Sequence, residues 1–162
     1  MSAVRIIVPI DAAAQSVGAN DVAVAIAREA AQRGIDIELV RNGSRGMLWL
    51  EPLVEVETNA GRIAYGPVAP EDVASLFNVG FLAGGEHRLG HGLTEAIPYF
   101  AKQERLSFAR CGVIDPLDLV DYEAHGGLTG LRRALAMQPQ DVVAKITESG
   151  LRGRGGAGFP TG

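Results

Sequence analysis

Residues 53–65 (LVEVETNAGRIAY) decide the fold of this chain. The first six of them alternate, so that Val54 and Val56 share one face of a strand while the intervening glutamates share the other. Residues 59–61 (NAG) have the composition of a tight turn, and the residues after them return as a second strand. The stretch therefore predicts an antiparallel β-hairpin with one buried face.

The sequence before the hairpin predicts a β-α-β unit. Residues 4–9 (VRIIVP) are β-branched and end in proline, and residues 35–40 (IDIELV) alternate, so each predicts a strand. Between them, apolar residues recur at helical spacing from Val22, after an N-cap signal at Asn20 and Asp21. After the hairpin, Pro-Glu-Asp opens a short helix. The order β-α-β-β-β-α predicts an α/β fold, a thioredoxin-like sandwich over residues 1–82.

The remaining residues divide into a linker and a terminal loop. We predict a linker and helical lead-in over residues 83–149 and a glycine-rich loop over residues 150–162. The glycines of residues 80–96 predict an irregular segment, and residues 98–110 an extended, positively charged strap. The predicted helices of the lead-in cover residues 115–125, 128–137 and 139–149.

Composition excludes several kinds of site. With 47% hydrophobic and 21% charged residues, the chain can build a packed core. The net charge of -4 does not suggest a nucleic-acid partner, and no apolar run is long enough for a membrane helix. Without a signal-peptide pattern we expect a cytoplasmic protein. The single cysteine, Cys111, excludes an internal disulfide, a cysteine-rich zinc site and an all-cysteine iron–sulfur cluster.

The candidate site lies in residues 150–162 (GLRGRGGAGFPTG). Six of the 21 glycines fall here, and a chain without Cβ atoms lets backbone N–H groups approach an anion. Arg152 and Arg154 add forked cationic donors, and Phe159 adds a flat face for an aromatic ring. The pattern predicts a phosphate cradle for a nucleotide or flavin, although it is neither a P-loop nor a Rossmann turn. A flexible glycine tail is the alternative that composition leaves open.

Four other residues could carry chemistry. His87 and His91 have i, i+4 spacing, but the surrounding glycines predict a loop with two solvated histidines and no metal. We predict that Cys111 is buried and unreactive, because no histidine is near it in sequence. Trp49 is either a core residue or a partner contact. No residue of the chain is predicted to be catalytic.

The glycine-rich segment resembles the signature of the flavin-bearing, NADH-oxidising subunits of respiratory complex I and its soluble relatives. Residues 99–135 resemble the helical lead-in of that family, and the first 80 residues resemble the thioredoxin-like ferredoxin domain that accompanies it. The resemblance implies FMN and NAD as cofactors of the intact subunit. Phe159 would stack on the NAD adenine, and the phosphates of FMN and NAD would face Gly153, Arg154, Gly155 and Gly156.

One departure from the family concerns its [2Fe–2S] cluster, which two pairs of cysteines hold. Alignment places Pro9 and Ala14 at the first pair and Ser44 and Leu48 at the second, so we expect no cluster in this chain. A cluster-less domain fused to the flavin subunit is similar to the β (diaphorase) subunit of soluble NAD-dependent formate dehydrogenases. Residues 39–52 (LVRNGSRGMLWLEP) resemble that subfamily in particular.

The second departure is length, because the family continues with the body of the flavin domain and a [4Fe–4S] section. We therefore expect the chain to be the N-terminal portion of a longer subunit and inactive by itself. The resemblance implies that the intact subunit passes electrons between iron–sulfur centres, FMN and NAD, with formate as the ultimate donor. It implies two partners, a catalytic molybdenum-type α subunit and a small iron–sulfur subunit. The alternative is a non-catalytic thioredoxin-like domain used for docking and assembly.

Overall fold

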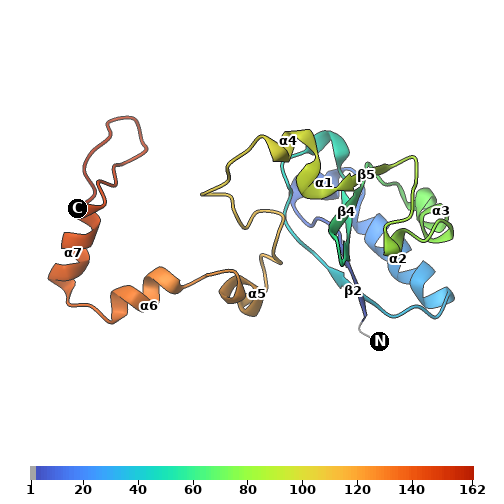
Figure 1. Cartoon of the computed structure of the whole chain (residues 1–162), viewed down its shortest axis with the longest axis horizontal. Helices are drawn as coiled ribbons and strands as arrows, with labels where there is room; N and C mark the ends of the chain where they lie inside the picture. The colour runs from blue at the N-terminus through green and yellow to red at the C-terminus, as the bar shows by residue number, and fades with distance from the viewer. Residues whose placement is uncertain (1–2) are drawn as a thin grey trace. The chain divides into compact units, whose positions relative to one another are not determined.

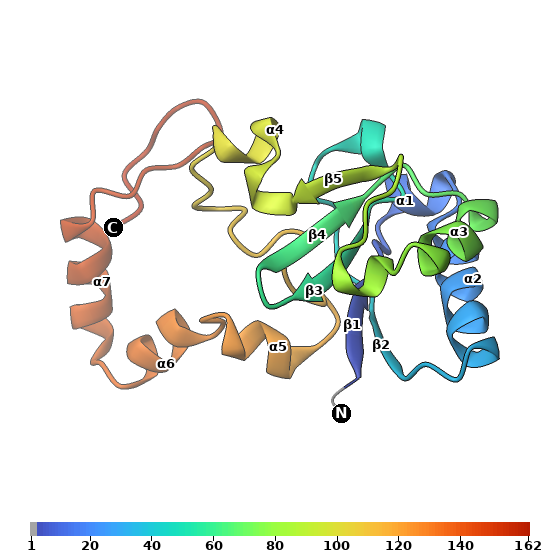
Figure 2. The same cartoon turned by 45° about the vertical axis from the view of Figure 1, so that its right-hand side comes forward.

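The computed structural model describes residues 3–162 and contains the predicted hairpin. β3 (Val54–Thr58) and β4 (Gly61–Tyr65) are antiparallel, with Val54 opposite Tyr65 and Thr58 opposite Gly61. The hairpin lies inside a five-stranded sheet of order β2-β1-β3-β4-β5 (Figure 2). β1 (Val4–Ile7) is parallel to β2 (Ile37–Val40) and antiparallel to β3, as the β-α-β-β order requires.

The last strand of the sheet was not predicted. β5 (Gly90–Leu93) pairs antiparallel with β4, so the expectation of a wholly irregular segment over residues 80–96 is wrong. Its sequence, GHGL, contains no β-branched residue, and its backbone is ordered by pairing with β4 rather than by propensity. The sheet therefore continues past residue 82, where we placed the end of the sandwich.

The helices that pack on the sheet follow β1 and β4. They are α1 (Ala12–Ser16), α2 (Ala19–Gln32) and α3 (Val73–Asn78). Asp11 caps α1, because its Oδ1 accepts bonds from two backbone N–H groups of the first turn. α2 begins at Ala19 without a side-chain cap, so the N-cap predicted at Asn20 and Asp21 is wrong. Asn20 and Asp21 already lie within α2, because α2 begins soon after the end of α1.

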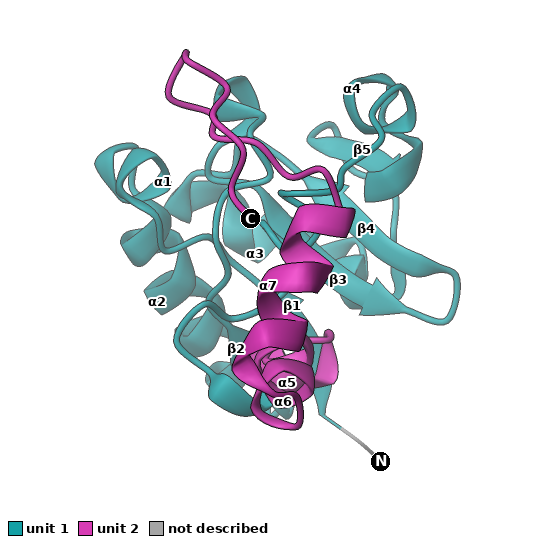
Figure 3. Ribbon diagram, turned by 90° about the vertical axis from the view of Figure 1, so that its left-hand side faces the viewer, with its two compact units in different colours: residues 1–121 teal, residues 122–162 magenta. Residues whose placement is uncertain are grey.

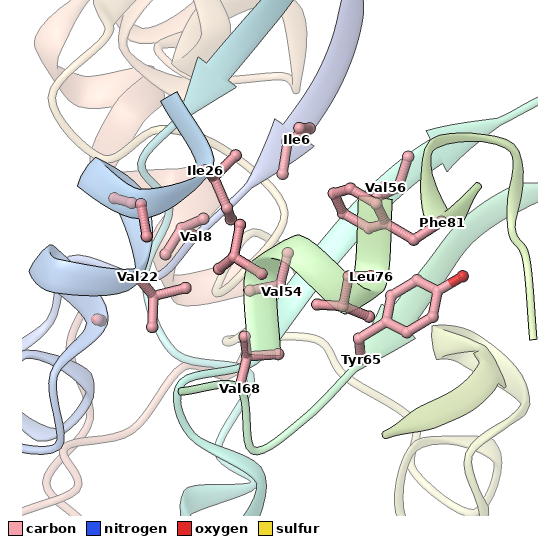
Figure 4. Close-up of a cluster of buried hydrophobic side chains, with 14 of the residues drawn as sticks. Ile6, Val8, Val22, Ile26, Val54, Val56, Tyr65, Val68, Leu76 and Phe81 are labelled. Atoms are coloured by element: carbon pink, nitrogen blue, oxygen red, sulfur yellow. The ribbon is translucent and has the colours of Figure 1, made fainter. Parts of the chain in front are cut away.

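The main core lies between these helices and one face of the sheet (Figure 4). Val54 and Val56 are fully buried there, as their alternation predicts. Side chains from α2, α3 and β1 meet them, and Figure 4 shows these groups pointing toward one another. The fully buried members include Ile6, Val8, Val22, Ile26 and Leu76. Burial of this apolar surface is the main favourable contribution to folding.

The opposite face of the sheet is also covered. A second cluster contains Met47, Leu50, Leu53, Ala64 and Phe100. Glu55 shares this face and is only 1% exposed, since the guanidinium of Arg45 bonds to it at 3.0 Å. The strand is therefore buried on both faces, not half-buried as its alternating sequence suggests.

The chain divides into two compact units, of which the first ends at Asp121 and the second begins at Tyr122 (Figure 3). The second contains α6 (Thr129–Leu135), α7 (Pro139–Glu148) and the terminal loop, while α5 (Leu119–Ala124) crosses the division. In the strap, α4 (Pro98–Ala101) replaces part of the extended segment that we predicted. Among the described residues, no helix has the length and apolar character to cross a membrane. The remaining 3₁₀ turns are Leu48–Leu50, Pro70–Asp72, Phe81–Ala83 and Thr94–Ala96.

Candidate functional site

Residues 150–162 form a closed loop after α7 (Figure 1). Its two arms pair where Arg152 lies opposite Pro160 in an antiparallel bridge. The backbone N–H of Gly153 donates to the carbonyl of Phe159 at 2.8 Å, and that of Thr161 donates to the carbonyl of Leu151 at 3.0 Å. The segment is therefore a backbone-paired loop and not an extended tail.

Glycines serve two different purposes in this loop. Gly156 has φ +103°, which a side chain would strain, so a glycine is required for the path of the backbone. Gly155 does not lie in the left-handed region, and a Cβ placed on it would meet no atom within 4 Å. Gly155 thus leaves an open surface where another molecule can approach the backbone.

The two arginines also differ. The Nε of Arg152 donates to the carbonyl of Gly158 at 2.6 Å, so this side chain ties the arms of the loop together. Arg154 is exposed and has no ion-pair partner among residues 3–162. Phe159, which is 77% exposed, presents its ring to solvent. Sequence reasoning treated both arginines as anion-binding candidates, but the structure leaves only Arg154 free for an anion.

The cavity beside this loop is small. It has a volume of about 130 Å³ and lies at the base of the loop, between the loop and α7. None of the five predicted residues (Gly153, Arg154, Gly155, Gly156 and Phe159) lines it. Ligand pockets usually have volumes of about 300–1,000 Å³ and bury most of the ligand. Arg154 thus offers an exposed cation, while the cavity is too small to enclose an aromatic ring system.

A second candidate site lies where the loops after β1 and β2 meet. Because these strands are parallel, their carboxyl ends lie at the same edge of the sheet. The backbone N–H of Ile10 donates to the carbonyl of Asn42 at 2.8 Å, and Arg41 donates to the carbonyl of Pro9 at 3.0 Å. The positions aligned with the family's cysteines follow these two strands, at Pro9 and Ala14 and at Ser44 and Leu48.

A buried carboxylate occupies this edge of the sheet. Glu51 is 6% exposed and accepts bonds from the hydroxyl of Ser44 and the backbone N–H of Leu53, each at 3.0 Å. Burial raises the pKa of Glu51, against the opposing effect of these bonds, and the negative charge of Asp11 raises it further. In residues 3–162, no group of three or more His, Cys, Asp or Glu side chains is arranged to hold a metal ion.

The remaining candidates lie differently from our predictions. His87 is half-buried rather than solvated, and its Nε2 lies 3.0 Å from the hydroxyl of Ser75. His91 is exposed as predicted, and its Nε2 lies 2.9 Å from the carbonyl of Gly66. Cys111 is exposed, so the prediction of a buried thiol is wrong. Trp49 is 61% exposed, which excludes a core role.

Known proteins resemble the chain in two ways. No family model matches it. In sequence it is 54% identical over 61 residues to the NADP-reducing hydrogenase subunit HndC of Solidesulfovibrio fructosivorans, and 68% identical over 41 residues to an NADH-quinone oxidoreductase subunit of Streptomyces coelicolor. These matches cover 38% and 25% of this chain, but 12% and 9% of the relatives. The chain thus spans about a tenth of the length of the curated relatives it matches.

In structure, the chain is similar to a thioredoxin-like [2Fe-2S] ferredoxin from Aquifex aeolicus, with a TM-score of 0.50 and 17% identity. The match covers 60% of this chain and 98% of the ferredoxin. The fold is thioredoxin-like. This confirms the predicted α/β class, with one mixed sheet and helices packed against it.

Proposed function

We propose that this chain is part of an FMN-dependent NADH oxidoreductase subunit, in which residues 150–162 bind the phosphates of FMN and NAD. The observation that carries the proposal is the closed loop, which leaves Arg154 and the surface at Gly155 open. The relatives support it, since one is named as a subunit of an NADP-reducing hydrogenase and the other as a subunit of an NADH-quinone oxidoreductase.

In this proposal the loop residues bind and orient the cofactors. The backbone N–H groups around Gly155 and Gly156 and the guanidinium of Arg154 donate to phosphate oxygens. Phe159 offers its exposed ring to the NAD adenine. FMN, when bound, supplies the exchange of electrons between NADH and iron–sulfur centres. The backbone N–H of Gly153 donates to the carbonyl of Phe159 and so fixes the backbone of Phe159 opposite Gly153.

A finer assignment follows from the resemblance of residues 39–52. We propose that the intact protein belongs to a soluble NAD-dependent formate dehydrogenase of the cytoplasm. Its partners would be a molybdenum-type catalytic subunit and a small iron–sulfur subunit, and its [4Fe–4S] cluster would be held outside residues 1–162. The thioredoxin-like unit would carry no cluster, because Ser44 and Leu48 replace one pair of cysteines and Pro9 and Ala14 the other.

A second candidate function is docking and assembly without redox chemistry. It is favoured by the edge of the sheet at the ends of β1 and β2. The side chain buried there is the carboxylate of Glu51, whose pKa is raised, and not a thiolate that could hold a redox cluster. The two functions are compatible in the intact protein, since one concerns the first unit and the other the terminal loop.

The test is a pair of substitutions in the intact subunit. Arg154→Ala should weaken FMN binding by roughly 10- to 150-fold, the range for a lost hydrogen bond to a charged group. Gly155→Val should lower FMN content further, because it places a branched side chain on the open surface without clashing inside the loop. FMN content and NADH kinetics are the measurements.

Gly130→Val is the matched control, since a Cβ on that glycine of α6 also meets no atom within 4 Å. It should keep full FMN and normal kinetics. If Gly155→Val does the same, the loop is a linker and the assignment of these residues fails.

A further inference from the structure

The two histidines of the first unit are bonded to the backbone around β5 in different ways. The backbone N–H of Leu89 donates to Nδ1 of His87 at 3.3 Å, while Nε2 of the same ring lies 3.0 Å from the hydroxyl of Ser75. His91 has its Nε2 against the carbonyl of Gly66, at 2.9 Å. One ring therefore accepts a hydrogen bond from the backbone, and the other donates one to it.

The partners of His87 decide which of its ring nitrogens carries the proton. Ser75 gives its hydroxyl hydrogen to the carbonyl of Asp72, at 2.8 Å, so its oxygen is an acceptor toward the ring. Nε2 must then donate to Ser75, and Nδ1 keeps the electron pair that accepts from Leu89. The bonding pattern thus requires a neutral imidazole with its proton on Nε2.

A second ring proton is compatible with the bonds of one histidine and not with those of the other. Histidine side chains gain that proton as the pH falls from about 8 to about 5. On His87 it occupies Nδ1 and faces the N–H of Leu89, so the bond between them is lost. On His91 the bond to Gly66 is kept, because Nε2 is a donor in the charged ring as well.

The ionisable groups around His87 come from its own loop, from the turn before α3 and from β4. They are Glu86, Arg88, Glu71, Asp72 and Tyr65. Arg88 is paired with Asp72, and burial raises the pKa of Tyr65, so its hydroxyl stays neutral. The carboxylates of Glu86 and Asp72 attract a charged imidazole, so the protonated ring has partners other than the backbone.

The bond at Leu89 is important because this residue connects its loop to the sheet. Its side chain is 8% exposed and belongs to the main core, and its carbonyl accepts from the N–H of Gly66 at 2.9 Å. β5 begins at the next residue. The same loop, with Ile63 and Tyr65 of β4, lines a cavity of about 370 Å³. Loosening Leu89 therefore loosens the start of β5 and one wall of this cavity.

We propose that His87 is a pH-sensitive switch for residues 85–90, the segment that leads into β5. In the neutral ring, Nδ1 holds Leu89 and with it the start of the strand. Protonation removes this acceptor, so the segment opens while β1 to β4 stay paired. His91, within the strand itself, does not act as a sensor. The proposal goes beyond the proposed function and does not depend on it, because every residue in it lies in the first unit.

The test measures hydrogen exchange in the whole chain at about pH 8 and about pH 5. Protection is the exchange rate of an unstructured peptide at the same pH divided by the measured rate. At the N–H groups of Leu89 and Gly66, protection should be about 2- to 12-fold lower at the acidic pH, the range for one lost hydrogen bond. The N–H of Val8, which donates to Val40 between β1 and β2, should keep its protection.

Two matched substitutions separate the roles of the histidines. His87→Asn places an oxygen at the position of Nδ1, which accepts from the N–H two residues later and does not titrate. The lost bond to Ser75 lowers protection equally at both pH values, so protection at Leu89 should no longer depend on pH. His91→Asn, the same change within β5, should leave the pH dependence of wild type in place.

A direct measurement checks the state of the ring without any substitution. At about pH 8, NMR of the imidazole nitrogens should show the proton of His87 on Nε2. A proton on Nδ1 would overturn the proposal, and so would wild-type protection at Leu89 that is equal at both pH values. A pH dependence that survives in His87→Asn, or an equal loss of protection at Val8, would assign the effect to another group and would also overturn it.

Discussion

At the scale of single residues, two buried glutamates, Glu51 and Glu55, differ in the groups that contact them. Glu55 has a cation against it, because both its oxygens accept from Arg45. Glu51 has instead the hydroxyl of Ser44 and the N–H of Leu53, which are neutral donors. The two glutamates are four residues apart and both buried, but only Glu55 has a cation paired with it.

The first prediction concerns the pH dependence of stability through Glu51. Burial raises its pKa above the ordinary value of 4.5, so above that pH the native state binds the proton more tightly than the unfolded chain. The free energy of unfolding contributed by this group therefore falls as the pH rises through that window. Glu51→Gln should remove this fall, so that wild type loses stability relative to the variant as the pH rises above 4.5.

Denaturant unfolding at several pH values measures this difference. Glu71→Gln, at an exposed position, is the control and should run parallel to wild type. Parallel curves for Glu51→Gln as well would contradict the assignment of a raised pKa to Glu51.

The second prediction concerns the ion pair of Arg45 and Glu55. Arg45→Met leaves the Glu55 carboxylate buried with only Arg62 nearby, at 3.9 Å. Removing one partner of a buried pair typically costs about 3–5 kcal/mol of unfolding free energy. Urea denaturation measures it, and the double variant Arg45→Met with Glu55→Leu should recover most of the loss.

Arg88→Met is the comparison, because Arg88 pairs with Asp72 from a side chain that is 68% exposed. Its cost should stay below about 1 kcal/mol. If both arginine variants cost the same, the Arg45 pair is not buried as described.

At the scale of elements, sequence patterns predicted what local periodicity controls. The hairpin, the first two strands and α7 were found from alternation, β-branching and an N-terminal proline. α1 was missed because its five residues, AAAQS, are too few to show a period, and its cap at Asp11 therefore went unnoticed. β5 was missed because glycines alternate with other residues in its sequence, GHGL, and because its pairing with β4 is a tertiary contact. The burial of Glu55 was not predicted either, because it depends on the ion pair with Arg45, ten residues earlier in the sequence.

The third prediction concerns how the terminal loop is closed. Arg152→Gln removes the bond from Nε to the carbonyl of Gly158, so the arms should separate more often. Hydrogen exchange at the N–H groups of Gly153 and Thr161 should then accelerate by about tenfold or more. Arg154→Gln, a matched change two residues away, should leave both rates unchanged. Equal acceleration in the two variants would show that Arg152 has no special part in closing the loop.

At the scale of the whole molecule, the sequence predicted the fold class because the order of elements restricts the topology. It also identified the glycine-rich loop, since its composition is unusual. It did not reveal a groove of about 830 Å³ that Leu48 and Phe108 line, because that surface joins segments some 60 residues apart. The family resemblance of residues 39–52 and of residues 99–135 does not indicate that the two segments meet. Trp49 was the one signal of a surface here, and sequence alone left it undecided between core and contact.

The last prediction is that this chain alone binds FMN weakly and shows no NADH–ferricyanide activity. The loop offers donors for phosphate, but its cavity of about 130 Å³ is too small for a flavin ring. Weak FMN binding should therefore act through the phosphate: inorganic phosphate should compete with it, and riboflavin, which has none, should not bind. Flavin fluorescence measures the binding, and the intact subunit in the same assay is the positive control. Activity of the 162-residue chain with added FMN would show that its own residues complete the flavin site, and riboflavin binding as tight as FMN would show that the loop recognises the ring and not the phosphate.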